Sequence, residues 1–281
     1  MIQELENTSI DITYKNIKPE KEDFIISVKN GCVLFSGRHD DSISFPRLKN
    51  MKAVPANIRY LFKIGSEKYF LVNDADAFGE FEYQRVKYSF TRRMKNKKEL
   101  YTAALAVSLS NWYETTRFCG KCGASMVHDK KERMMFCPEC GVIEYPRICP
   151  CIIAGVINNG KILVTKYRGS TSENYALVAG FAEAGETIEQ CAIREVYEET
   201  HVKIKNLKFY RSQPWPYSSS LLFGFFCELD GDEDIEIEPN ELSMAKFVSP
   251  EEITEEFNDC SLTNEMLCKF RDDMLTYGKL L

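Results

Sequence analysis

The sequence lacks the long apolar run that a membrane-spanning helix needs. No stretch reaches the roughly 18 consecutive apolar residues that mark such a helix. The N-terminus, Met-Ile-Gln-Glu-Leu-Glu, is acidic, whereas a secretory signal peptide begins with a basic region. These two absences predict a cytoplasmic protein without a membrane partner.

Positive charge is not in excess either, since the net charge is −6. This balance argues against a protein whose main task is nonspecific binding to nucleic acid. Histidine is scarce, and His39, His128 and His201 have no partner spacing that indicates a metal site. The chemistry inferred below needs none of them as a general base.

The composition that remains is that of an ordinary globular protein, 44% hydrophobic and 28% charged. A chain of 281 residues is long enough for two domains, each with its own core. The 11 cysteines are an odd number in a chain without an export signal. They favour reduced thiols and a metal site over disulfides.

The beginning of the chain has the pattern of a β-rich domain. Short apolar or alternating runs, such as residues 24–28, 32–35 and 69–72, are separated by turn signals that include Asn30-Gly31. No catalytic motif is visible among them. We therefore expect a β-rich N-terminal domain over residues 1–98.

A basic segment and a helix should follow. Residues 85–98 carry seven basic residues and no acidic one, a run that is usually a solvated surface. Contact with substrate phosphates or RNA is the alternative interpretation. Residues 100–112 are rich in Ala and Leu, and no flexible linker is visible, so we expect a connecting helix over residues 99–116.

Two Cys-x-x-Cys pairs, Cys119 with Cys122 and Cys137 with Cys140, are separated by fourteen residues. Four thiolates at this spacing can close a tetrahedral Zn²⁺ site of the zinc-ribbon type, which we expect over residues 117–146. Because the thiolates fill all four positions, the one Zn²⁺ expected per chain is structural and not catalytic. A set of buried free thiols is the alternative.

Strands should follow the ribbon. Residues 151–157 and 161–166, joined by an Asn-Asn-Gly turn, predict a hairpin. Residues 175–179 predict a further strand that leads into a Gly-containing loop. We expect this region to belong to a C-terminal domain over residues 147–281.

A helix should follow Thr187, because Thr187 and Gln190 form a capping box and no Gly or Pro interrupts the next residues. On this helix Glu195, Glu198 and Glu199 fall within an arc of about 100°. Three carboxylates so close repel one another unless divalent cations neutralise them, and oxygen ligands favour Mg²⁺ or Mn²⁺ over zinc. A solvated acidic face is the alternative.

The opposite side of the same helix is expected to be apolar, because it carries Ile193, Val196 and Tyr197. The spacing of residues before and along this helix decides whether its acidic side is a cation site or a solvated surface. Six residues define the spacing, in the order Gly180, Glu186, Arg194, Glu195, Glu198 and Glu199. This spacing resembles the Nudix box, the signature of hydrolases that cleave nucleoside diphosphates linked to another moiety.

One position departs from the box, because His201 stands where the box has Gly. A Gly there would cap the helix with positive φ, and His is among the residues that tolerate this region best. The departure therefore concerns the geometry of the loop and not the metal ligands.

A proline-bounded segment lies further along. Residues 212–220 read Ser-Gln-Pro-Trp-Pro-Tyr-Ser-Ser-Ser, and two prolines around a Trp enforce an extended segment that presents an aromatic face and hydroxyls. With the Nudix box and the zinc ribbon, it is similar to the NADH pyrophosphatase branch of the Nudix superfamily. The similarity covers about residues 100–275. This branch has Pro where the chain has Ser218, which concerns the nicotinamide side of the substrate.

The resemblance implies a fold and an activity. The fold would be α+β, a Nudix α/β/α sandwich with a mixed sheet, preceded by the zinc ribbon and the β-rich N-terminal domain. Members of this branch hydrolyse NAD(H) to AMP and nicotinamide mononucleotide, and some remove NAD caps from RNA. A homodimer is also implied.

The resemblance assigns roles to individual residues. The structural zinc ligands match Cys119, Cys122, Cys137 and Cys140. The ligands of catalytic Mg²⁺ or Mn²⁺ match the Ala179 carbonyl, Glu195, Glu198, Glu199 and Glu241. Arg194 would orient a box glutamate and Glu186 would stabilise the loop. The substrate contacts match Glu132, Tyr145, Phe181, Gln213, Pro214, Trp215, Pro216, Tyr217, Ser218, Ser219 and Ser220.

Without the resemblance, Glu241 would be interpreted as a surface residue. It ends an acidic stretch, residues 228–241, in which Ile235 and Ile237 alternate with glutamates as in an exposed strand.

The expected reaction is the attack of water on one phosphorus of the diphosphate, assisted by the divalent ions. Displacement at the adenylyl phosphorus would release AMP. Two alternatives stay open: a Nudix hydrolase of ADP-ribose or dinucleoside polyphosphates, and a zinc-ribbon nucleic-acid-binding regulator with the Nudix fold as a scaffold. The intact box argues against the regulator, because a retired active site has no need of three crowded carboxylates.

Overall fold

The computed structural model describes residues 1, 3–5, 8–37, 43–52, 54–55, 57–86, 97–170, 174–258 and 260–280. The chain divides into two compact units. The N-terminal unit comprises Ile2–Arg147 with Pro216–Ser219, and the C-terminal unit comprises Met1, Ile148–Trp215 and Ser220–Leu281. Over the described ranges, the helices are too short or too polar to cross a membrane.

A six-stranded sheet in the order β1-β4-β5-β2-β3-β6 organises the N-terminal unit. Its strands are β1 (Ile10–Asp11), β2 (Phe24–Lys29), β3 (Cys32–Phe35), β4 (Arg59–Ile64), β5 (Glu67–Asn73) and β6 (Glu82–Arg85). The runs predicted as strands lie in β2, β3 and β5, and this prediction is confirmed. Asn30 and Gly31 both have positive φ, 52° and 72°, as a two-residue turn between β2 and β3 requires. A single 3₁₀ turn, η1 (Leu48–Asn50), connects β3 to β4 among the described residues.

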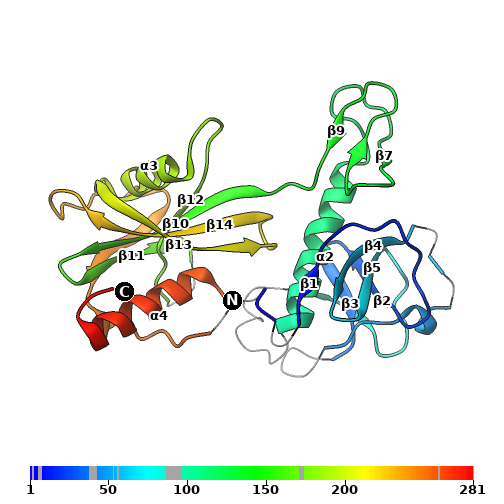
Figure 1. The fold of residues 1–281 in the computed structure, drawn as a ribbon, viewed down its shortest axis with the longest axis horizontal. Coiled ribbons are helices and arrows are strands. Elements are labelled where there is room, and N and C mark those ends of the chain that lie inside the picture. Colours follow the sequence, from blue (N-terminus) through cyan, green and yellow to red (C-terminus); the bar gives the residue numbers. More distant parts are fainter. Residues whose placement is uncertain are drawn as a thin grey trace. The chain divides into compact units, whose positions relative to one another are not determined.

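Helix α2 (Lys97–Thr115) packs against this sheet (Figure 1). Its buried side chains, which include Leu100, Ala103 and Trp112, share one hydrophobic cluster with residues of β2 to β5. The predicted connecting helix is therefore a core element of the N-terminal unit. Of the basic segment before it, residues 87–96 lie outside the described residues, as does His39.

The ribbon of three two-residue strands follows α2: β7 (Val127–His128), β8 (Met135–Phe136) and β9 (Ile143–Glu144). Such strands are too short to enclose a core of their own. Met126 and Met135 belong to the same hydrophobic cluster as α2 and the six-stranded sheet. The ribbon thus depends on the rest of the N-terminal unit and on whatever crosslinks its two cysteine pairs.

The C-terminal unit contains a sheet in the order β13-β14-β10-β11-β15, with β12 also paired to β10. Its strands are β10 (Cys149–Asn158), β11 (Lys161–Tyr167), β12 (Val178–Phe181), β13 (Ile204–Trp215), β14 (Ser220–Leu229) and β15 (Leu242–Val248). The pairing of β10 with β14 is parallel and the other pairings are antiparallel, so the sheet is mixed. The predicted hairpin is formed by β10 and β11.

Helices α3 (Ile188–Thr200) and α4 (Leu262–Tyr277) cover opposite faces of this sheet (Figure 1). Cys191, Ala192 and Val196 of α3 pack in one hydrophobic cluster, and Met266 and Phe270 of α4 pack in the other. The short turn η2 (Pro250–Glu252) leads toward α4. The α/β/α sandwich with a mixed sheet is confirmed.

The acidic stretch before β15 differs from the expectation of an exposed strand. Residues 230–241 contain no strand. The backbone N–H of Glu236 donates to the Thr200 carbonyl (3.2 Å), and that of Glu238 donates to the Glu199 carbonyl (3.0 Å). Because these donors bind carbonyls at the end of α3, they do not form a strand ladder. The segment instead holds Glu241 near the helix that carries the box glutamates.

Candidate active site and metal centre

Helix α3 begins and ends where the sequence predicts. The Gln190 N–H donates to Thr187 Oγ1 (3.2 Å), and the Thr187 N–H donates to Gln190 Oε1 (2.8 Å), which completes the capping box. His201 has φ of 57° and donates its backbone N–H to the Tyr197 carbonyl (2.8 Å). The residue that replaces the box Gly therefore adopts the left-handed conformation that a Gly would adopt.

The apolar side of α3 is only partly buried. Val196 is fully buried on the sheet, but Ile193 and Tyr197 are each 46% exposed. The apolar side of α3 and its buried side therefore coincide only at Val196. The buried side also contains Cys191 and Ala192, whereas Ile193 and Tyr197 lie outside it.

Arg194 connects the glutamates of the box. Its guanidinium donates to both oxygens of Glu186, from Nε (2.8 Å) and Nη2 (2.9 Å). Nη1 donates to Glu195 Oε1 and to Glu198 Oε2, each at 2.8 Å, and Nη2 donates to the Phe181 carbonyl (2.9 Å). The Arg194 guanidinium holds the pKa of Glu186 down at about 2, so Glu186 stays ionised. The arginine thereby fixes the loop before α3 to the helix.

Glu199 is the most deeply buried acid of the group, with 2% of its surface exposed. Its Oε2 is buried and has no hydrogen-bond partner among the described residues. Burial, and then the negative charges of Glu195 and Glu241, raise the pKa of Glu199 to about 8. Burial also raises the pKa of Glu195, against the opposing effect of Arg194. A divalent cation binds buried carboxylate oxygens that have no hydrogen-bond donor, and it neutralises their negative charge. Glu199, together with the charges of Glu195 and Glu241, therefore fits such an ion.

The close approach of α3 to β12 requires glycine at position 180. A Cβ on Gly180 would lie 1.9 Å from Glu195 Cδ. Any larger residue would displace the Glu195 carboxylate from the strand. Ala179, the predicted carbonyl ligand, is the neighbouring residue in β12 and pairs with Ile153 of β10.

Glu241 reaches the site from a separate part of the chain. It is exposed and directly precedes β15, and its carbonyl accepts a hydrogen bond from the Arg168 N–H (2.7 Å). Its charge acts on both Glu195 and Glu199, which places it on their side of the unit. The described acids do not form a cage as tight as the cysteine cluster, whose ligand atoms all lie within 4.8 Å of one another.

The segment predicted to contact substrate is divided between the two units. Gln213 to Trp215 end β13 and Ser220 begins β14, whereas Pro216 to Ser219 are grouped with the N-terminal unit. Gln213 is fully buried: its Nε2 donates to the Cys260 carbonyl (2.9 Å), and its Oε1 accepts from the Leu262 N–H (2.8 Å). Its side chain therefore anchors the start of α4.

The other predicted substrate contacts are exposed. Phe181 ends β12 and is 51% exposed. Glu132 and Tyr145 lie together in the N-terminal unit, where the Tyr145 hydroxyl donates to Glu132 Oε2 (2.8 Å). An aromatic ring on the surface of each unit is thus available to a ligand.

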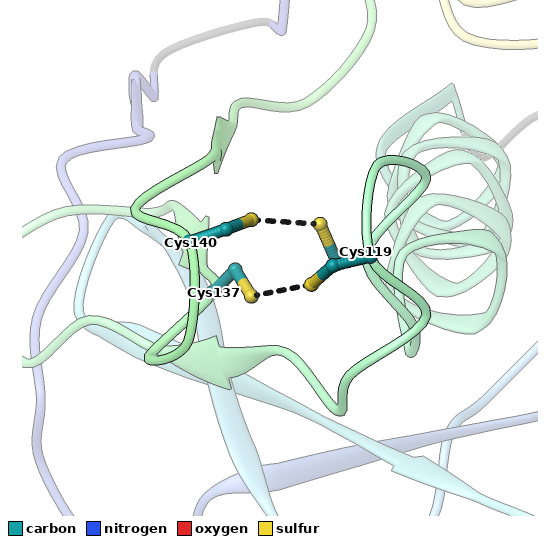
Figure 2. Close-up of side chains that lie close together, drawn as sticks. Cys119, Cys137 and Cys140 are labelled. Carbon is teal, nitrogen blue, oxygen red and sulfur yellow. Dashed lines mark hydrogen bonds between the residues drawn. The ribbon is translucent and has the colours of Figure 1, made fainter.

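The four cysteines of the ribbon converge on one point (Figure 2). The Sγ atoms of Cys119 and Cys140 are 3.5 Å apart, as are those of Cys122 and Cys137. Sulfurs around a tetrahedral zinc with Zn–S bonds of about 2.3 Å lie about 3.8 Å apart, so the arrangement fits a structural Zn²⁺. The backbone N–H groups of Cys122 and Lys121 lower the pKa of Cys119 to about 7, which favours the thiolate that zinc binds.

Both cysteine pairs have the same backbone. Each is followed by a glycine with positive φ, Gly123 at 76° and Gly141 at 73°. The Gly123 N–H donates to the Cys119 carbonyl (2.9 Å), and the Gly141 N–H donates to the Cys137 carbonyl (3.0 Å). Two matching turns present the sulfurs from opposite sides, as a closed site with four protein ligands requires.

Two side chains near the carboxylates were not predicted from the sequence. The charges of Glu195 and Glu199 act on Cys151 of β10, and together with Glu241 they act on Tyr167 at the end of β11. The strand alternation of β11 was the available signal for Tyr167, because it assigns this residue to one face of the sheet. Strand alternation does not show which strand pairs with β11, so it could not predict that Tyr167 lies beside Leu242 of β15.

Comparison with known proteins agrees with these two sites. Residues 151–270 match the NUDIX domain, and residues 114–145 match the NADH pyrophosphatase zinc ribbon domain. The NAD-capped RNA hydrolase NudC of Pectobacterium carotovorum subsp. carotovorum (strain PC1) is 43% identical over 143 residues, 51% of this chain and 55% of that protein. The NAD-capped RNA hydrolase NudC of Escherichia coli O9:H4 (strain HS) is 40% identical over 145 residues, 52% of this chain and 56% of that protein.

The chain spans about half the length of the curated relatives that it matches. Among solved structures, a NUDIX hydrolase from Nitrosomonas europaea is similar over 57% of this chain and 93% of its own, with 22% identity and a TM-score of 0.49. The matched residues contain the Arg194 network and all four ribbon cysteines. Residues 151–270 are therefore a Nudix domain, and the domain that precedes it is a zinc ribbon of the NADH pyrophosphatase type.

Proposed function

We propose that the protein is a metal-dependent diphosphatase that hydrolyses the pyrophosphate bond of NAD(H) to AMP and nicotinamide mononucleotide, and that it also removes NAD caps from RNA. The proposal is supported by the occurrence of a Nudix domain and an NADH pyrophosphatase zinc ribbon in one chain. It is also supported by relatives that are named NAD-capped RNA hydrolases and are 40% to 43% identical over the matched region.

The observation that carries the proposal is the buried Glu199 carboxylate, which has an oxygen without a partner and lies near two further acids. Such a group is unfavourable in a structural role and suits a site that receives cations with a diphosphate. Mg²⁺ or Mn²⁺, when bound, neutralises the charge of the diphosphate and makes a water more acidic for attack on phosphorus. Glu195, Glu198, Glu199, Glu241 and the Ala179 carbonyl are the proposed ligands.

The remaining residues of the box act by positioning. Arg194, bound at both oxygens of Glu186, holds Glu195 and Glu198 in fixed rotamers at the helix. Because the Arg194 guanidinium also binds the Phe181 carbonyl, the same contact sets the end of β12, from which the Phe181 ring would stack on a base of the substrate. The network therefore links the cation site to substrate binding.

The rest of the substrate is assigned to the proline-bounded segment, Pro214 to Ser220, and to Glu132 and Tyr145. We assign these residues to the nucleotide portions of the substrate, because they supply aromatic rings and hydroxyl groups, which bind bases and ribose. The proposed enzyme is cytoplasmic and homodimeric, with a β-rich domain over residues 1–98, a helix over 99–116, the ribbon over 117–146 and the Nudix domain over 147–281.

The test is to incubate the purified protein with NADH and either Mg²⁺ or Mn²⁺, and to separate the products by chromatography. The wild type should give AMP and reduced nicotinamide mononucleotide. Glu199→Gln should lower turnover by three orders of magnitude or more, roughly the effect of losing a principal electrostatic group, without loss of fold.

Glu189→Gln is the matched control, since Glu189 lies exposed in the first turn of the same helix. It should retain the turnover of the wild type. An RNA that carries a 5′ NAD cap, offered in parallel, reports whether the same site also removes the cap. Near-normal cleavage by Glu199→Gln, or no cleavage of either substrate by the wild type, would contradict the proposal.

A further inference from the structure

Tyr167, the last residue of β11, lies on the face of the sheet that α3 covers. Side chains alternate between faces along a strand, so Leu163, Thr165 and Tyr167 share one face. Leu163 packs in the hydrophobic cluster that contains Cys191 and Val196 of α3, and Thr165 is fully buried. Tyr167 continues this row to the end of the strand, where 36% of its surface is exposed.

A β-bulge brings Tyr167 next to the start of β15, directly after Glu241. The pairing of β11 with β15 shifts between Lys166 and Tyr167, so that Tyr167 pairs with Leu242, the residue after Glu241. The residue left out of the ladder, Ser243, donates its hydroxyl to the Lys166 carbonyl (3.1 Å). Bulges redirect side chains, and they are frequent beside active sites.

The surroundings of the Tyr167 hydroxyl are negatively charged. The charges that act on it include those of Glu199, Glu195 and Glu241, and a tyrosine hydroxyl ordinarily keeps its proton at neutral pH. The side chains named are acceptors when they are ionised, and Tyr167 is a donor. The strand places it on the face that α3 covers, and the bulge places it beside Leu242, the residue after Glu241.

The Tyr167 hydroxyl and the buried carboxylate oxygen Glu199 Oε2 are both left without a hydrogen bond in the part of the chain that the structure describes. No hydrogen bond of the Tyr167 hydroxyl is formed with any described residue, and Glu199 Oε2 also has no partner there. Two polar groups that face one site and do not bind each other are satisfied by a ligand that has a cation for the carboxylate and an oxygen for the hydroxyl. A diphosphate with its divalent ion has both.

We propose that Tyr167 is a substrate-binding residue of this site, whose hydroxyl donates a hydrogen bond to a diphosphate oxygen while Glu195, Glu199 and Glu241 face the cations. The inference rests on the proposed function, since it takes the ligand to be a diphosphate. The Tyr167 hydroxyl is a neutral hydrogen-bond donor in a site whose other proposed side chains are acids. A donor of this kind binds a phosphate oxygen and does not bind the metal ion.

The test compares Tyr167→Phe, which removes one oxygen and keeps the ring, with Tyr197→Phe as a matched control. Tyr197 lies on the outward side of α3, where its ring is 5.4 Å from that of His201. Isothermal titration with inorganic pyrophosphate in excess Mn²⁺ should show affinity about tenfold weaker or more for Tyr167→Phe, the usual effect of losing a hydrogen bond to a charged group. Tyr197→Phe should bind as the wild type does.

Mn²⁺ binding alone, followed by electron paramagnetic resonance, should be the same in all three proteins. With NADH, Tyr167→Phe should raise KM about tenfold and leave kcat within about threefold, because the hydrogen bond forms before and during the reaction. Equal melting temperatures of the three proteins establish that the fold is intact.

Equal pyrophosphate affinity in the wild type and Tyr167→Phe would overturn the inference. Weaker Mn²⁺ binding by Tyr167→Phe would also overturn it, because the hydroxyl would then act on the cation. If the wild type cleaves neither NADH nor capped RNA while pyrophosphate still distinguishes Tyr167→Phe from the wild type, the proposed function fails and the diphosphate contact stands.

Discussion

A single arginine organises the acids of the Nudix box. Arg194 binds Glu186 through two nitrogens and reaches Glu195 and Glu198 through a third. The guanidinium is planar and carries five donors, so it can serve three carboxylates and a carbonyl at once. Lysine has the same charge but only a point-like ammonium group. At this position geometry matters more than charge.

Arg194→Lys is therefore expected to impair the proposed hydrolysis of NADH although charge is conserved. The lysine cannot hold both Glu186 oxygens and also reach Glu195, so the loop and the helix lose their connection. We expect kcat for NADH to fall about 10- to 100-fold and the unfolding free energy to fall by about 1 to 2 kcal/mol. Steady-state kinetics and urea unfolding measure the two effects.

Arg211→Lys is the control for this substitution. Arg211 donates from Nη1 to Glu265 Oε1 (2.8 Å), and the Arg211 side chain is 40% exposed. The arginine end of this pair is exposed and the contact uses one nitrogen, which an ammonium can replace, so we expect a loss of about 1 kcal/mol or less. Equal losses in Arg194→Lys and Arg211→Lys would show that the forked contact is not what matters.

The residues of this site that sequence analysis identifies lie close together along the chain. Glu186 and Arg194 are eight positions apart, and the resemblance of this spacing to the Nudix box gives both residues a role in the site. Tyr167 joins the site through strand pairing with residues near 242, which no local pattern reveals. Gln213 is predicted to touch substrate, yet its burial depends on where Cys260 and Leu262 come to lie. Long-range packing decides such cases.

At the scale of elements, both ends of α3 could be predicted because helix caps are local. Thr187 and Gln190 satisfy the first N–H groups, and His201 adopts the left-handed cap. The segment before β15 could not be predicted in the same way. Its alternation indicates a strand, but the carbonyls at the end of α3 take the N–H groups of Glu236 and Glu238.

Strand β7 carries a half-buried histidine, His128, whose contacts should make the stability of the N-terminal unit depend on pH. The Tyr113 hydroxyl lies 3.0 Å from His128 Nε2, and the Asp129 carbonyl lies 2.5 Å from Nδ1. Burial, together with the charges of Arg59 and Arg133, lowers the pKa of His128, although the Asp129 carbonyl opposes this. The folded unit therefore binds a proton at His128 less readily than the unfolded chain does.

The sign of the effect on stability follows from proton uptake. Below pH about 6.5 the unfolded chain protonates His128 while the folded chain resists, so stability is present above that pH and is lost as the pH falls. The loss for one such group is at most about 1.4 kcal/mol per pH unit. Urea unfolding at pH 7.5 and 5.5, followed by the fluorescence of Trp112, should show it.

His128→Gln should reduce this pH dependence, because glutamine does not titrate. His201→Gln is the control, since His201 lies exposed at the end of α3 in the C-terminal unit. If His128→Gln and the wild type lose the same stability between the two pH values, His128 is not the cause.

At the scale of the whole molecule, one hydrophobic core crosses the boundaries that the sequence suggests. The six-stranded sheet, α2 and the ribbon contribute to a single cluster, in which Cys119 and Cys137 are both buried. Sequence patterns indicate a domain, a helix and a ribbon, because composition changes from one to the next. They cannot show that these parts share a core, since that follows from contacts between distant residues.

This shared core makes a distinct prediction about zinc. In a ribbon that depended only on itself, loss of zinc would unfold residues 117–146 and nothing else. Here two of the four zinc-binding cysteines, Cys119 and Cys137, are buried in the core of the N-terminal unit, so loss of zinc would remove a crosslink from that core. Loss of zinc should therefore loosen α2 and the six-stranded sheet, and leave the sandwich of the C-terminal unit intact.

Hydrogen exchange followed by mass spectrometry, on the protein with both Cys119→Ser and Cys122→Ser, separates these outcomes. Peptides from α2 should exchange about tenfold faster or more than in the wild type, and peptides from α3 should exchange at the same rate. Cys32→Ser is the control, because Cys32 lies half-buried in β3 of the same unit and belongs to no metal cluster among the described residues. Unchanged protection of α2 after zinc is lost would mean that the ribbon is a separate folding unit, and that its contacts with the helix contribute little to the stability of the core.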